Sequence, residues 1–293
     1  MKPEAIKALV TLLDDPDQKI FGAVAEKLLG EGEEVIPLLE QAWESSLNPL
    51  VQDRIENLIA DIQKQTTEKG INSWVNSLNP KLIDGAYWVS RLAYPELDEN
   101  HTMQLIEKIK KDVWLELNQS LTALEKVKVL NYVLFDVHGF ANHNTNVFSL
   151  PSSFVHQVLE TRRGNPYSLA IIYAGIAQML ELPIYGVNLP RNFLLAYKDP
   201  IYSHIADASS KSKVLFYINP YNKGAVLGYK EVDHYLEQLN VEKKEEYYLP
   251  CSNIQTIVRL IEHIIASYQR MGYNEKAEGM QRLISIIQSK SID

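Results

Sequence analysis

The sequence predicts a mainly α-helical α+β protein with a small antiparallel sheet. Within residues 3–64, apolar residues recur at the 3.6-residue spacing of amphipathic helices. Residues 168–182 are almost free of charge, which predicts a helix that is buried on most sides. Between residues 184 and 218 the period shortens to about two, in short runs rich in β-branched and aromatic residues. These runs predict the sheet.

Composition limits the classes of function. The net charge is -8 and the charges are interspersed, so we do not expect nucleic acid as a partner. No apolar run approaches the roughly 20 residues of a membrane-spanning helix, and an amphipathic helix follows Met1 where a signal peptide would need an apolar core. We therefore expect a cytoplasmic protein with no membrane association. The single Cys251 excludes an internal disulfide and a multi-cysteine metal site, and we expect neither metal nor cofactor.

The N-terminal segment, residues 1–66, is predicted to be a separate helical cap. Two turn signals, Asp14–Asp17 and Asn48–Pro49, lie about 33 residues apart, and a helix follows each. This spacing resembles HEAT-type repeats, which implies a face that binds a protein partner. A plain helical cap that packs on the rest of the chain explains the same pattern.

A second domain, residues 71–249, is predicted to follow a linker at Thr66–Gly70. Leu82–Tyr94 is an apolar helix, and Asp98 or Asn100 caps a helix that reaches about Leu117. Thr122–Glu125 has the spacing of a capping box ahead of another helix. The loop 139–151 then has no hydrophobic period.

The stretch Glu160–Ala170 is predicted to deliver a polar loop onto the start of the buried helix. Asn165 can cap the first turn, and Pro166 suits the first helical position. The start of a buried helix is a common place for a nucleophile, because the dipole and the free N–H groups favour an anion. Here that position holds a proline.

The remaining chain supplies the sheet and a C-terminal hairpin. The predicted strands are 184–187, 193–197 and 214–218, and a helix covers Tyr229–Leu239. Residues 250–293 are predicted to form a third domain, a helical hairpin that turns at Gly272 and is similar to a tetratricopeptide unit.

Four blocks in this order resemble the SirB-type branch of the transglutaminase-like superfamily. They are Trp88–Asp98, Gly139–Asn142, Val158–Pro166 and Leu182–Pro190. The resemblance covers about residues 80 to 230 and implies a papain-like core, in which helices pack on a small antiparallel sheet.

Active members of that superfamily use a cysteine at the start of the central helix, then a histidine and an aspartate on successive strands. The resemblance puts Pro166, Asn192 and Asn219 at these three positions. Proline offers neither a nucleophilic atom nor an N–H group, and an amide cannot take up a proton near neutral pH. We therefore expect a pseudoenzyme.

Two interpretations of the degenerate site remain open. In one, the two amides only keep the core hydrogen-bonded. In the other, a neutral polar cleft binds a peptide or a small polar ligand. The residues that would line this cleft are Asn165, Tyr167, Ser168, Asn192 and Asn219.

Other chemistry finds weaker support. Ser168 could act as a nucleophile with His143, His156 or His204 as base, but a serine at a helix start usually bonds to backbone. A metal could bind near His138 and Asn142–Asn144, or at His204 with Asp207, although neither spacing is diagnostic.

The sequence thus predicts a non-catalytic binding, scaffolding or regulatory protein of a bacterial cytoplasm. The alternative is a hydrolase or acyltransferase that uses unrecognised residues in the same cleft.

Overall fold

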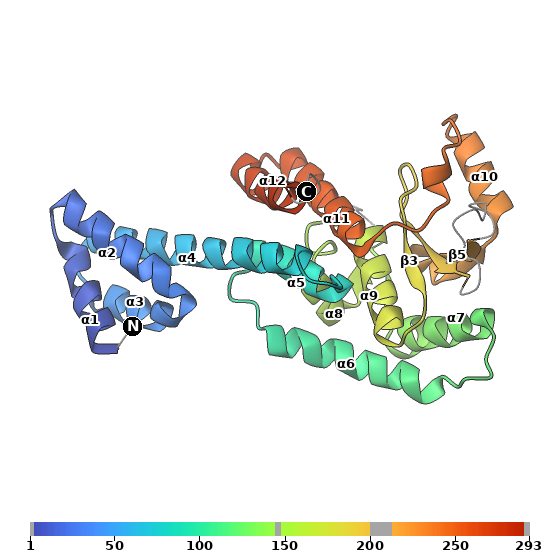
Figure 1. The fold of residues 1–293 in the computed structure, drawn as a ribbon, viewed down its shortest axis with the longest axis horizontal. Coiled ribbons are helices and arrows are strands. Elements are labelled where there is room, and N and C mark those ends of the chain that lie inside the picture. The colour runs from blue at the N-terminus through green and yellow to red at the C-terminus, as the bar shows by residue number, and fades with distance from the viewer. Residues whose placement is uncertain (1–2, 144–147, 200–212, 290–293) are drawn as a thin grey trace. The chain divides into compact units, whose positions relative to one another are not determined.

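The computed structural model describes residues 3–143, 148–199 and 213–289. It has the predicted α+β architecture, mainly helical with a small antiparallel sheet (Figure 1). The chain divides into two compact units, Met1–Gly70 and Ile71–Asp293. Three of the candidate metal ligands or bases lie outside the described residues, namely Asn144, His204 and Asp207. Within the described ranges, no helix combines the length and the apolar character that crossing a membrane requires.

The first unit is built from four helices around an aliphatic core. They are α1 (Pro3–Thr11), α2 (Gln18–Glu31), α3 (Ile36–Ser45) and α4 (Pro49–Val75). Leu13, Leu28, Leu39 and Ile55 are fully buried in this core. Arg54 is buried beside them and donates to the carbonyl oxygens of Leu13 and Asp15, which holds the predicted turn after α1. Whether these helices are HEAT-type repeats stays a prediction.

The predicted linker at Thr66–Gly70 is wrong, because α4 runs through it without a break. Buried side chains lie along one side of this part of the helix at Thr67, Ile71 and Trp74. Their spacing is helical, so burial of this stripe outweighs the cost of about 1 kcal/mol for a glycine inside a helix. The boundary between the two units therefore lies inside a helix and not in a loop.

The second unit begins with helices whose ends follow the predicted capping signals. Asp98 caps α6 by accepting from the Asn100 N–H at 2.8 Å, and Thr122 and Glu125 form the capping box of α7. A π-helical segment, Tyr132–Val137, continues α7. The helices of this unit are α5 (Leu82–Ala93), α6 (Glu99–Glu116), α7 (Ala123–Asn131), α8 (Val155–Thr161), α9 (Pro166–Met179), α10 (Tyr229–Gln238), α11 (Asn253–Arg270) and α12 (Asn274–Gln288).

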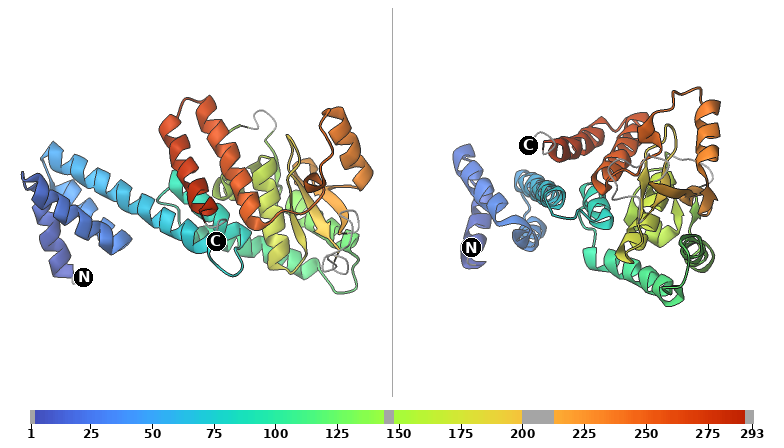
Figure 2. Two further views of the ribbon diagram at one scale, coloured as in Figure 1. Left: turned by 45° about the horizontal axis from the view of Figure 1, so that its top comes forward. Right: turned by 45° about the vertical axis from the view of Figure 1, so that its right-hand side comes forward.

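The sheet is antiparallel and ordered β3-β4-β5-β6 (Figure 2). Its strands are β3 (Ile184–Val187), β4 (Leu194–Lys198), β5 (Val214–Asn219) and β6 (Ala225–Leu227). The first three were predicted, whereas β6 was not. A short parallel pair, β1 (Ala141–Asn142) with β2 (Arg163–Gly164), was also missed, because two-residue strands carry no periodicity.

Helix α9 lies at the centre of the second unit. It contacts α5, α6, α8, α11 and the strands β3 and β4, so nearly all of its residues are buried. The C-terminal hairpin of α11 and α12 shares this core through Ile257, Ile261, Ile264 and Leu283. This hairpin is therefore part of the second unit and not a separate compact body.

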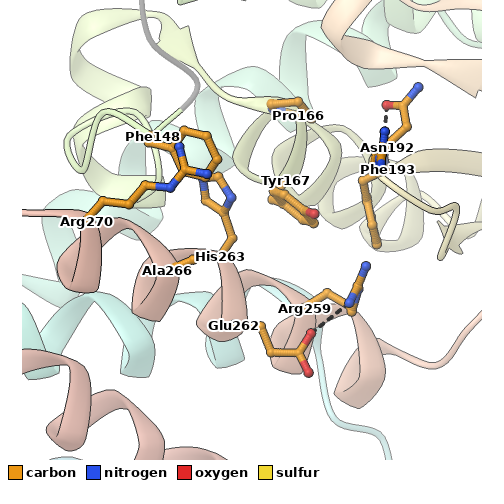
Figure 3. A pocket seen from close by; sticks show the side chains of 11 residues that line it. Phe148, Pro166, Tyr167, Asn192, Phe193, Arg259, Glu262, His263, Ala266 and Arg270 are labelled. Carbon is orange, nitrogen blue, oxygen red and sulfur yellow. Dashed lines mark hydrogen bonds and ion pairs between the residues drawn. The ribbon is translucent and has the colours of Figure 1, made fainter.

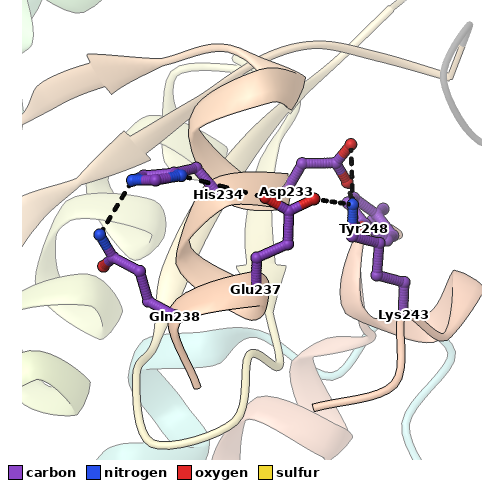
Figure 4. Close-up of polar contacts among 6 residues, drawn as sticks. All are labelled: Asp233, His234, Glu237, Gln238, Lys243 and Tyr248. Atoms are coloured by element: carbon purple, nitrogen blue, oxygen red, sulfur yellow. Dashed lines mark hydrogen bonds and ion pairs between the residues drawn. The ribbon is translucent and has the colours of Figure 1, made fainter. Parts of the chain in front are cut away.

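A smaller core lies between the sheet and α10. Val232 and Leu236 of α10 pack with Tyr217 of β5 and with Tyr248. At its edge, Asp233 accepts from the Tyr248 hydroxyl, and Lys243 pairs with Asp233 and Glu237 (Figure 4). Burial, the largest cause, and the hydrogen bond to Asp233 raise the pKa of the Tyr248 hydroxyl, which stays protonated and donates.

Candidate functional site

The start of α9 is a closed hydrogen-bond network, as the capping signal predicts. The Asn165 side-chain oxygen accepts from the N–H groups of Tyr167 and Ser168 at 3.0 and 2.9 Å. Its amide group donates to Ser153 Oγ at 2.8 Å, and the Asn165 backbone N–H donates to Ser168 Oγ. Ser168 Oγ in turn donates to the Ser152 carbonyl oxygen at 2.6 Å. Asn165 and Ser168 are both completely buried.

Gly164 lets the preceding strand lie directly on this network. A Cβ at residue 164 would come within 2.8 Å of Ser168 Oγ and of Leu169 Cγ. Contacts this short force neighbouring atoms to move, so a side chain at this position would displace the cap. The glycine is therefore required by packing at the helix start.

A cavity of about 490 Å³ lies beside the first turn of α9 (Figure 3). The start of α9, the β3–β4 turn and one face of α11 form most of its wall, and Phe148 from the loop before α8 completes it. Its eleven lining residues are Phe148, Pro166, Tyr167, Arg191, Asn192, Phe193, Arg259, Glu262, His263, Ala266 and Arg270.

Aromatic rings form the base of the cavity. The Tyr167 ring lies 4.8 Å from the His263 ring and 5.3 Å from the Phe193 ring. The His263 ring also stacks on Phe148 at 5.3 Å, and the Arg270 guanidinium lies 3.5 Å from the centre of the Phe148 ring. These contacts fix the rings in place.

Charge in the cavity comes mainly from α11. Arg259 Nη1 donates to Glu262 Oε2 at 2.8 Å, and Arg191 and Arg270 bring two more guanidinium groups. Burial raises the pKa of the Tyr167 hydroxyl, and the nearby Arg259 opposes that rise. Tyr167 is therefore a neutral hydroxyl at physiological pH.

Three of the predicted site residues meet in this cavity. Pro166, Tyr167 and Asn192 line it. Asn165 and Ser168 do not, because they are sealed in the capping network. Asn219 lies at the end of β5, where its side chain caps the next turn by accepting from the Asn222 N–H, and it is not part of the cavity wall.

The prediction of a neutral cleft is also wrong. The cavity has three arginines and one glutamate, which α11 and the β3–β4 turn contribute and which sequence reasoning did not connect with α9. The two amides do not replace a histidine–aspartate pair by a bond to each other. The Asn192 side-chain oxygen accepts from the Phe193 N–H at 2.8 Å, so each amide is used in its own turn.

The remaining candidates occupy other surroundings. His156 is buried beside Tyr94, and burial lowers its pKa to about 4. His138 binds Asp112 at 2.9 Å between Nε2 and Oδ2, away from the cavity lining. In residues 3–143, 148–199 and 213–289, no group of three or more His, Cys, Asp or Glu side chains could hold a metal ion.

The residues of α11 were missed although they leave a trace in the sequence. Five cavity residues recur at helical spacing on one face of α11: Arg259, Glu262, His263, Ala266 and Arg270. This pattern predicts a polar helix face, but it does not predict which other segment lies opposite. The partner segment at Pro166–Tyr167 is more than ninety residues away along the chain.

Comparison with known proteins places most of the cavity lining within a matched region, and His263, Ala266 and Arg270 lie beyond its end. A family model described as the transglutaminase-like superfamily matches residues 100–262, more than half of the chain. No solved structure matches.

Relatives match over part of their length. A UPF0162 protein of Xylella fastidiosa is 31% identical over 39% of this chain and 41% of its own length. A UPF0162 protein of Pseudomonas aeruginosa is 26% identical over 45% of this chain and 47% of its own length. The mouse F-box only protein 21 is 30% identical over 37% of this chain and 17% of its own length. This chain therefore spans less than half the length of the curated relatives it matches.

Proposed function

The chain belongs to the transglutaminase-like superfamily, and we propose that it is a non-catalytic member of the SirB type that binds a ligand in the cavity beside α9. The observation that carries this proposal is the chemistry of the cavity wall. None of its eleven residues is a cysteine, serine or threonine, and Pro166 and Asn192 occupy the positions that the resemblance assigns to nucleophile and base. Such a wall can hold a ligand but offers neither the thiol of a cysteine nor the hydroxyl of a serine or threonine as a nucleophile.

The alternative, a hydrolase or acyltransferase using other residues, has two candidate nucleophiles nearby. Ser168 Oγ already donates to a carbonyl oxygen and is completely buried. Cys251 lines a neighbouring cavity, and burial raises the pKa of its thiol, which disfavours the reactive thiolate. Cys251 precedes α11, whereas His263 is about ten residues into it, which separates the two by roughly 15 Å along the helix. A base at that distance cannot take the proton of the thiol.

The first unit supports the binding role by its charge. Residues 1–70 carry 14 Asp and Glu against 7 Lys and Arg, so they hold most of the net charge of -8. Trp43 is partly exposed there beside Glu40, Glu44 and Glu56, and its indole N–H donates to Glu56 at 2.8 Å. A surface of one sign with an exposed aromatic ring suits a basic segment of a protein partner.

Turnover assays on the purified chain test the proposal. We expect no hydrolysis or transamidation of fluorogenic amide and ester substrates above the rate of buffer. A catalytic chain would release product at a rate that Tyr167→Phe or His263→Gln lowers, while Arg282→Gln, an exposed residue of α12 outside the cavity, leaves that rate unchanged. That result would replace the binding proposal by the enzyme alternative.

A further inference from the structure

The cavity beside α9 is electropositive in an acidic protein. Arg191, Arg259 and Arg270 oppose the single carboxylate of Glu262. Two excess positive charges in a concave site attract anions even when the net charge of the chain is -8. The aromatic base of Tyr167, Phe148 and His263 provides apolar area for the rest of a ligand.

Arg259 is left with an unused donor. Its Nη1 donates to Glu262, whereas its Nε–H is buried and has no acceptor among the described residues. An unpaired buried donor costs about 1–3 kcal/mol, so an acceptor that reaches it is stabilised. The side chain is 31% exposed and lines the cavity, and the guanidinium edge that carries Nε–H is the one that Glu262 does not use. That edge has the fork of two donors that fits a carboxylate.

A second cavity shares this ion pair in its wall. It has a volume of about 390 Å³ and shares Arg259 and Glu262 with the first. In its wall, Asn188 Oδ1 is a buried acceptor without a donor among the described residues. The two cavities together thus present an unused donor and an unused acceptor, and their walls carry three arginines against the two carboxylates of Glu246 and Glu262.

We propose that these two cavities bind an acidic peptide segment. A side-chain carboxylate of the peptide lies against Arg259, with Arg191 and Arg270 around it, and a backbone N–H of the peptide donates to Asn188 Oδ1. A peptide satisfies both orphaned atoms because it carries acceptors and donors, whereas a fully ionised inorganic anion supplies acceptors alone. The inference rests on the proposed binding function and names the ligand class of that same site.

Fluorescence anisotropy with the full chain tests the proposal. The probe is a fluorescein-labelled hexapeptide with two central glutamates in a glycine background, and its matched control has two glutamines. We expect the glutamate peptide to bind more tightly than the glutamine peptide, and to weaken as salt rises. Arg259→Gln is expected to weaken binding about tenfold or more, and Asn188→Leu about three- to tenfold. Arg282→Gln is the matched control with a lost charge outside the cavities.

Arg259→Lys distinguishes a loss of binding from misfolding, because it keeps the positive charge and removes the two-donor edge of the guanidinium. We expect it to bind with an affinity between that of the wild type and that of Arg259→Gln, with an unchanged melting temperature. Equal binding of the two peptides, or equal effects of Arg259→Gln and Arg282→Gln, would overturn the proposal. Inorganic phosphate that competes as well as the unlabelled peptide would show an anion site and overturn the peptide part.

Different results would contradict the non-catalytic binding function and the choice of an acidic peptide as ligand. A glutamate peptide that binds and is then cleaved leaves the ligand class standing and removes the non-catalytic function. A glutamate peptide that does not bind, with no turnover of any substrate, removes the ligand class alone.

Discussion

Helices α9 and α11 both border the cavity, yet they differ in how their polar groups are used. At the start of α9, Asn165 and Ser168 are fully buried, and each is satisfied by several hydrogen bonds within the chain. On α11, Arg259 keeps one buried donor unpaired, and Arg270 rests on an aromatic ring. One helix has completed its polar contacts, whereas the other has not.

The difference separates stability from binding within a single site. Groups that are fully satisfied by the fold stabilise it, and their removal leaves buried orphans. Groups that the fold leaves partly unsatisfied contribute little to stability and are available to a ligand. Substitutions near α9 should therefore change the free energy of unfolding, whereas substitutions on the cavity face of α11 should change affinity.

Asn165→Ala should have the largest effect on stability. It removes the cap of α9, leaves the N–H groups of Tyr167 and Ser168 without their acceptor and takes one hydrogen bond from the Ser153 hydroxyl, so we expect a loss of about 3 kcal/mol in the free energy of unfolding. Urea denaturation measures this loss. Asp98→Ala removes the exposed cap of α6 and should cost only about 1 kcal/mol. Equal losses would mean that burial of the α9 cap adds nothing.

Acid should destabilise the second unit through His156, which is buried in α8 beside Tyr94. Burial lowers the folded-state pKa of His156 to about 4, below its unfolded value near 6.5. The unfolded state therefore binds the proton first, so this contribution is fully present above pH 6.5 and is lost as pH falls toward 4. We expect a loss of up to about 3 kcal/mol.

Urea denaturation at a series of pH values measures this slope. His156→Leu should flatten it, although the pKa of His138 is also lowered by burial and keeps part of the slope. His234→Leu, on the exposed face of α10, is the control for removing an imidazole outside the core. A slope that persists in full in His156→Leu would remove His156 from the explanation.

Gly175→Ala tests how closely α9 packs on α5. A Cβ at residue 175 would come within 2.5 Å of Ile83 Cδ1, so we expect a loss of about 1–2 kcal/mol despite the better helix propensity of alanine. Gly22→Ala in α2 has no atom within 4 Å of the new Cβ and should stabilise the first unit by about 0.5–1 kcal/mol. Thermal melts measure both changes, and we expect a lower melting temperature for Gly175→Ala and a higher one for Gly22→Ala.

Arg270→Gln should have the smallest effect on stability, below about 1 kcal/mol, because it removes one partly exposed cation–π contact with Phe148. Affinity for the glutamate peptide should fall at the same time. Anisotropy and urea denaturation on one preparation compare the two quantities. A variant that loses stability but keeps its affinity would show that Arg270 of α11 stabilises the fold and does not bind the peptide.

The sequence by itself determined most of the elements and the starts of the capped helices. The cap at Asn165, the capping box at Thr122–Glu125 and the three longer strands all follow from local chemistry, in which a side chain bonds its own neighbours. The resemblance found the transglutaminase-like region for the same reason, because its blocks are local. The two-residue strands and the helical residues 66–70 were missed because short range signals are weak there.

Only the tertiary structure decided what the site contains. It brought α11 against the start of α9, put Asn165 and Ser168 under the surface, and left Asn219 at the end of β5. The burial of apolar faces across the whole core decides which helices pack against each other. This burial does not depend on distance along the chain. The charge of the cavity therefore could not be predicted from the residues around Pro166.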